Sequence, residues 1–158
     1  MPDIVGKVGF TSGAFTVWAK VAYDEDIAPA SAGWLGARAA GLSGVDGWAG
    51  QVGAQIDVPN MPGSSFRIIG FYANNANAYA VGSTWSVLAS YNQQFSPTFG
   101  ASIGGQWFGD INYGAAGNPT AYQVELSIVA TPVTNLEIRA EINYYDSSTA
   151  AGVTSGFL

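Results

Sequence analysis

Apolar and polar residues alternate along most of this chain with a period of two. That period is typical of β-strands whose two faces meet different surroundings. The clearest example is 136–144, where apolar positions alternate with Glu137, Arg139, Glu141 and Asn143. The same pattern predicts further strands at 122–131, 99–107, 84–92, 48–57 and 15–24, and in a weaker form at 65–73, 3–11 and 152–158.

The connections between these segments favour an antiparallel meander. Short turns rich in Gly, Pro, Asn and Ser are predicted at 12–13, 58–63, 96–98 and 132–135. Longer connections are expected near 74–83, 108–120 and 146–152. Because short and long connections alternate, 24–47 is predicted to be one long loop. Within it, a short helix or an extra strand around 34–40 is left open. We therefore predict an all-β fold, a single domain over 1–158 with about nine antiparallel strands.

Aromatic rings mark both ends of the apolar face in several strands. They include Phe15, Tyr23, Trp85, Phe99 and Trp107, and small aliphatic residues lie between the two ends. Amphipathic rings favour the membrane–water interface, whereas hydrocarbon accepts aliphatic surface. From Phe99 to Trp107 a strand rises about 26 Å at ~3.3 Å per residue, and a tilt of ~40° reduces this to a height of roughly 20 Å. That height is close to the ~25 Å apolar band of outer-membrane barrels.

The residue composition of the polar face distinguishes a membrane barrel from its main alternative. That alternative is a soluble β-sandwich or lipocalin-like barrel with aromatic rings at the edges of its core. This face is mostly Gly, Ser, Thr, Gln and Asn. Such short residues would leave a closed barrel of about eight to ten strands hollow, and they suit a wide, watery lumen better. Because an open sheet edge cannot face lipid, we predict that the chain is part of a larger transmembrane β-barrel.

Composition removes several classes of function. Only 10% of the residues are charged, the net charge is −6, and the chain contains neither Cys nor His. The acidic balance argues against nucleic-acid binding, and disulfides, Cys/His zinc sites and histidine bases are excluded. No apolar run approaches the ~18 residues of a transmembrane helix. The amino terminus lacks the basic and apolar regions of a signal peptide, which leaves a cytoplasmic protein, a mature chain and a fragment as alternatives.

Four segments of the chain together resemble the alphaproteobacterial outer-membrane porin family. They are 57–67 (DVPNMPGSSFR), 83–91 (STWSVLASY), 131–135 (TPVTN, followed by Glu137 and Arg139) and 153–158 (VTSGFL). The resemblance covers most of the chain apart from 24–47. It implies the carboxy-terminal half of a 16-stranded porin in the bacterial outer membrane, a passive diffusion channel for small hydrophilic solutes and ions. The implied partners are outer-membrane lipid, the amino-terminal half with its constriction loop, and two further copies in a homotrimer.

The charged residues of the polar faces are the candidate pore-lining residues. These are Lys20, Asp57, Arg67, Glu125, Glu137, Arg139 and Glu141. Charges on a barrel wall set ion selectivity, and the alternative is a set of solvated or mutually paired charges that only support the wall. A glycosidase-like carboxylate pair of Glu125 and Glu141 and a cation site at 24–26 are disfavoured. We therefore predict no enzyme activity, no cofactor and no metal, with a non-conducting binding or structural β-barrel as the alternative function.

Overall fold

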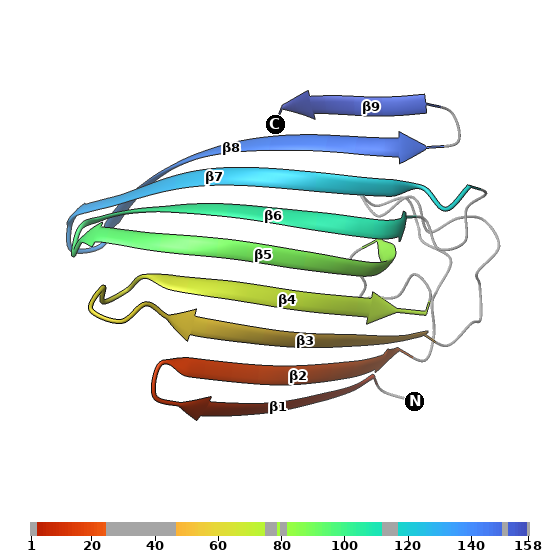
Figure 1. Ribbon diagram of the computed structural model, residues 1–158, viewed down its shortest axis with the longest axis horizontal. Coiled ribbons are helices and arrows are strands. Elements are labelled where there is room, and N and C mark those ends of the chain that lie inside the picture. The colour runs from red at the N-terminus through yellow and green to blue at the C-terminus, as the bar shows by residue number, and fades with distance from the viewer. Residues whose placement is uncertain are drawn as a thin grey trace.

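One antiparallel sheet makes up the part of the chain that the computed structural model describes, residues 3–24, 47–74, 79, 82–111, 117–149 and 152–157. Nine strands follow one another in chain order across the sheet (Figure 1). They are β1 (Ile4–Ser12), β2 (Phe15–Asp24), β3 (Gly47–Asp57), β4 (Ser65–Ala73), β5 (Ser83–Ser96), β6 (Phe99–Ile111), β7 (Thr120–Val133), β8 (Leu136–Thr149) and β9 (Gly152–Phe157). The predicted all-β meander is confirmed.

Tight turns join the strands in pairs at one end of the sheet, which we call the turn end. Gly13 in the β1–β2 turn and Asn135 in the β7–β8 turn have positive φ angles of 57° and 70°. Gly and Asn tolerate this conformation better than other residues. Strands β2, β4, β6 and β8 end at the opposite end of the sheet, where β3, β5, β7 and β9 begin (Figure 1). The predicted alternative conformations around 34–40 lie outside the described residues.

The strands at the carboxy-terminal side extend further than the sequence pattern predicts. The long connection expected at 146–152 is wrong, because β8 continues to Thr149 and β9 begins at Gly152. Residues 146–148 look like turn formers, but they pair with β7, and the Ser148 hydroxyl lies 3.1 Å from that of Thr120. Likewise β6 continues to Ile111, which shortens the connection expected at 108–120.

The sheet is a single layer without a packed core. Among the described residues, the buried hydrophobic side chains are all alanines: Ala22, Ala49, Ala73 and Ala121. Large apolar side chains are instead exposed, such as Val52 at 61% and Ile142 at 59%. A soluble sheet normally covers such a face with a second layer. The apolar face therefore needs an apolar surrounding.

Both outer strands have an unpaired edge within the described residues. β1 pairs with β2, β9 pairs with β8, and the sheet is not closed by pairing between β1 and β9. An unpaired edge presents a row of backbone N–H and C=O groups that seek further strands. In hydrocarbon these groups must be paired. The nine strands thus form a curved part of a wall rather than a closed barrel.

Candidate pore wall

The pairing register carries the alternation of each strand across the whole sheet. Residues opposite one another share a face, and one such row runs from Gln55 through Arg67, Ser90 and Gly104 to Glu125. We call the face that contains this row the polar face. The other face, which includes Val52 and Ile103, is called the apolar face. A shift of one residue in any pair would exchange the faces. The matching alternation of β1 to β8 therefore defines two distinct surfaces.

All seven candidate pore-lining residues lie on the polar face. Lys20 is opposite Gln51, Asp57 opposite Ser65, Arg67 opposite Gln55, Glu125 opposite Asn143, Arg139 opposite Val129 and Glu141 opposite Ser127, and Glu137 lies near the turn end of β8. The structure brings Glu137, Arg139 and Glu141 into contact. Lys20 and Glu125 make no hydrogen bond or ion pair with the other described residues. The candidate set therefore lines one surface but does not form a single site.

Arg139 joins the two carboxylates that flank it on β8. Its Nη2 lies 2.9 Å from Glu137 Oε1, and its Nη1 lies 3.3 Å from Glu141 Oε1. Residues two apart on a strand point to the same face, so the flexible arginine reaches both neighbours. All three side chains remain about half exposed. Such pairs contribute little to stability, but they fix where the charges lie on the wall.

A second polar network orients Arg67. Gln55 Oε1 accepts hydrogen bonds from Arg67 Nε at 3.1 Å and from Nη2 at 2.6 Å. The Gln55 amide nitrogen in turn donates to Asp57 Oδ1 at 2.9 Å. The guanidinium is therefore held on the β3 side of its strand, and the carboxylate of Asp57 is joined to it through a neutral amide.

The structure adds Lys7 and Asp110 to the charged residues of the polar face. Lys7 of β1 lies directly opposite Lys20, so two like charges face each other. It was missed because the alternation of 3–11 is weak. Asp110, expected in the connection 108–120, lies within β6. Asp24 and Trp18 lie on the polar face of β2, as the alternation over 15–24 predicts. Trp18 is opposite both Gly9 and Gly53, which leave room for its indole.

The apolar face carries aromatic rings near both ends of the strands, including all five predicted positions Phe15, Tyr23, Trp85, Phe99 and Trp107. At the end opposite the turns, the ring centroids of Trp85 and Trp107 lie 4.0 Å apart, and those of Trp48 and Tyr72 lie 5.0 Å apart. At the turn end, Phe95 and Phe99 stack at 5.5 Å. Two belts of rings with aliphatic side chains between them are typical of a membrane-spanning β-sheet.

Asp146 is a charged residue on the otherwise apolar face. The sequence pattern predicted that it lies in a loop. It lies opposite Tyr122 near the end of β8. The hydroxyls of Tyr122 and Tyr144 donate to its Oδ2 at 3.2 and 3.4 Å. The two phenols thus hydrogen-bond the carboxylate within the aromatic belt.

At the same end of the sheet, the Tyr79 hydroxyl donates a hydrogen bond to Asp3 at 2.9 Å, and this hydrogen bond raises the pKa of Tyr79.

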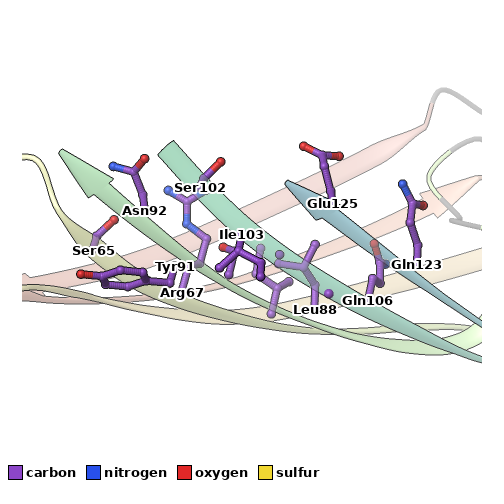
Figure 2. A pocket seen from close by; sticks show the side chains of 14 residues that line it. Ser65, Arg67, Leu88, Tyr91, Asn92, Ser102, Ile103, Gln106, Gln123 and Glu125 are labelled. Atoms are coloured by element: carbon purple, nitrogen blue, oxygen red, sulfur yellow. The ribbon is translucent and has the colours of Figure 1, made fainter. Parts of the chain in front are cut away.

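A shallow hollow of about 490 Å³ lies on the polar face over β4 to β7. Figure 2 shows Arg67, Asn92, Ser102 and Glu125 rising from the same side of these strands. The carboxylate pair gains no support from the geometry, because Glu125 and Glu141 lie in different rows of the sheet. The cation site considered at 24–26 lies outside the described residues apart from Asp24. Within the described residues, no three or more acidic side chains are grouped to hold a metal ion.

The sheet has one layer, a polar face, and an apolar face with aromatic rings near both ends of its strands. These features are those of the wall of a transmembrane β-barrel. The family model of the porin subfamily matches residues 1–156, and the chain belongs to this family. Comparison with curated proteins gave no match, and comparison with solved structures gave none. Within the described residues, no helix is long and apolar enough to cross a membrane.

Proposed function

We propose that the polar face lines a passive diffusion channel for small hydrophilic solutes and ions across the bacterial outer membrane. The observation that carries this proposal is the common register of nine strands, which gathers Lys20, Arg67, Glu125 and Arg139 on one face and aliphatic side chains on the other. Membership of the porin subfamily supports a channel rather than an enzyme. Water and ions would pass along the polar face while lipid covers the apolar face.

Short side chains on the polar face support a conducting lumen over a filled one. Ser90, Gly104 and Ser102 occupy the middle of the wall on β5 and β6. A narrow barrel must fill its interior with large side chains, whereas a wide barrel leaves an aqueous channel. The row of Ser90 and Gly104 contributes little bulk to the interior, and the larger Ile69 and Leu88 lie one row away. A non-conducting binding or structural barrel is therefore the less favoured function.

Closure of the barrel requires strands beyond the nine described here. We infer that these strands pair with β1 and β9 and belong to the amino-terminal half of a porin. By resemblance to the family, three such barrels associate as a homotrimer. Mass measurement of the detergent-solubilised complex tests the assembly, with three copies expected. A detergent-free monomer that melts cooperatively would contradict membrane assembly.

Planar bilayer recording tests the channel function. The complete porin, purified in detergent from outer membranes, is expected to insert with stepwise increases in conductance. Liposome swelling with sugars of increasing size would then report the solutes that pass. A correctly assembled barrel that inserts into the bilayer without conductance would contradict the proposal and favour the non-conducting alternative.

A further inference from the structure

The hollow on the polar face has opposite charges at its two sides. Arg67 of β4 and Glu125 of β7 belong to the same row, and only Ser90 and Gly104 lie between them. Three strand spacings of ~4.8 Å place their Cα atoms about 14 Å apart. Because Ser90 and Gly104 are short, no side chain of this row separates the two charged groups. Both residues line the hollow (Figure 2).

Both charged groups keep hydrogen-bonding capacity toward the hollow. A guanidinium has five N–H donors, and Arg67 uses its Nε and Nη2 on Gln55. Its Nη1 makes no hydrogen bond to the described residues. The Glu125 carboxylate accepts no hydrogen bond and forms no ion pair within that same part of the chain, although it is half-buried. A cation donor, held at the β3 side of the hollow by Gln55, and an anion acceptor thus border one space without meeting each other.

The remaining lining is uncharged and mixed, because Ile69 and Leu88 lie beside polar side chains. Asn92, Ser102, Gln106 and Gln123 contribute amide and hydroxyl groups to the hollow. A simple anion would satisfy Arg67 but meet repulsion from Glu125, and a simple cation would meet the reverse. An uncharged sugar would use neither charge. A solute with a carboxylate at one end and an ammonium at the other matches both sides.

We propose that this hollow is a transient binding subsite for small zwitterionic peptides, with the carboxylate at Arg67 and the ammonium at Glu125. The inference rests on the proposed channel function. An extended dipeptide spans about 7 Å at ~3.3–3.6 Å per residue, and a contact of ~3 Å at each end gives about 13 Å, against ~14 Å between the two Cα atoms. To reach the carboxylate, the exposed Arg67 side chain turns from Gln55 of β3 toward the hollow. Both charges are open to water, so binding is weak, which suits a site that a passing solute must leave.

Block of the ion current by glycylglycine tests the subsite in the complete porin. Glycylglycine is titrated into the planar bilayer chamber, and its uncharged analogue N-acetylglycinamide is titrated in parallel. We expect half-block by glycylglycine at a lower concentration than by the analogue. Arg67→Gln and Glu125→Gln should each raise the glycylglycine concentration for half-block about threefold to fivefold, the scale of one exposed ion pair. Neither variant should change the response to the analogue.

The matched controls are Arg139→Gln and Glu141→Gln, which change the same residue types on the same face outside the hollow. They are expected to leave glycylglycine block unchanged. Salt conductance without any preference for glycylglycine, or equal weakening by the control variants, would overturn the subsite and leave the channel function standing. Absence of conductance in the unmodified porin would overturn the channel function itself. Unchanged heat-modified electrophoretic mobility of each variant establishes that the barrel has folded.

Discussion

Gly53 of β3 lies directly opposite Trp18 of β2 on the polar face, and the indole of Trp18 occupies the space where a Cβ of residue 53 would stand. The ring therefore lies along the wall rather than across the lumen. Only glycine provides this space, because every other residue has a Cβ. This pair shows that a bulky apolar side chain on the polar face is compatible with an open channel.

Gly53→Ala should force the Trp18 indole away from the wall. Overpacking of this kind costs about 1–3 kcal/mol, so the denaturant midpoint of the folded barrel should fall and the Trp18 emission should change. Gly104→Ala is the matched control on the same face, since its new Cβ would meet Ser90 Cβ at an ordinary 3.5 Å. Equal destabilisation by both variants would show that Trp18 is not held as the structure has it.

A charge in the middle of the apolar face should destabilise the barrel. Leu126 is 46% exposed on this face, and Leu126→Arg is expected to lower the free energy of unfolding in lipid vesicles by about 2–4 kcal/mol. Gln123→Arg, on the same strand but on the polar face, should have a much smaller effect. If the two substitutions cost the same, the apolar face does not contact hydrocarbon.

Depth-dependent fluorescence quenching should locate the aromatic belt. In variants that keep one tryptophan and replace the others with Phe, Trp85 and Trp107 should be quenched most by lipids brominated near the headgroup. Trp18 on the polar face serves as the control and should be quenched weakly by any brominated lipid. Quenching of Trp18 as strong as that of Trp85 would contradict the assignment of the two faces.

The charges of β8 should modulate ion selectivity. Four basic side chains of the described polar face, Lys7, Lys20, Arg67 and Arg139, stand against six acidic ones, Asp24, Asp57, Asp110, Glu125, Glu137 and Glu141. We expect a weak cation preference that fades as salt rises, because the Debye length is ~10 Å at 0.1 M.

Reversal potentials under a salt gradient measure this preference. Replacing both Glu137 and Glu141 with Gln should reduce it, and Arg139→Gln should increase it. Arg139→Lys keeps the charge and should leave the reversal potential unchanged. If the reversal potential does not change when both glutamates are replaced, Glu137 and Glu141 only support the wall and have no role in selectivity.

Much of the fold could be predicted because strand alternation depends on local sequence. Segments such as 99–107 and 122–131 alternate strongly, since each face meets one kind of surrounding. The strand ends were harder to predict. Asp146, Ser147 and Ser148 resemble a turn locally, and only pairing with β7 makes them part of a strand. Local sequence does not report such a partner.

The candidate residues could be placed on a face, but their contacts depend on register. The contact of Arg139 with Glu137 follows from a spacing of two along one strand. The contact between Arg67 and Gln55 does not, because the β3–β4 turn determines which residues lie opposite each other. The same reasoning explains why the row that joins Arg67 to Glu125 was not apparent, since it spans four strands.

Cysteine accessibility along β7 tests the central claim most directly, that the polar face lines an aqueous channel and the apolar face does not. The chain contains no cysteine, so single substitutions report one position each. Gln123→Cys and Glu125→Cys should react with a charged, membrane-impermeant methanethiosulfonate reagent and change the bilayer conductance. Val124→Cys and Leu126→Cys, between and beyond them on the other face, should not react. Equal reactivity at all four positions, or the reverse pattern, would contradict the account.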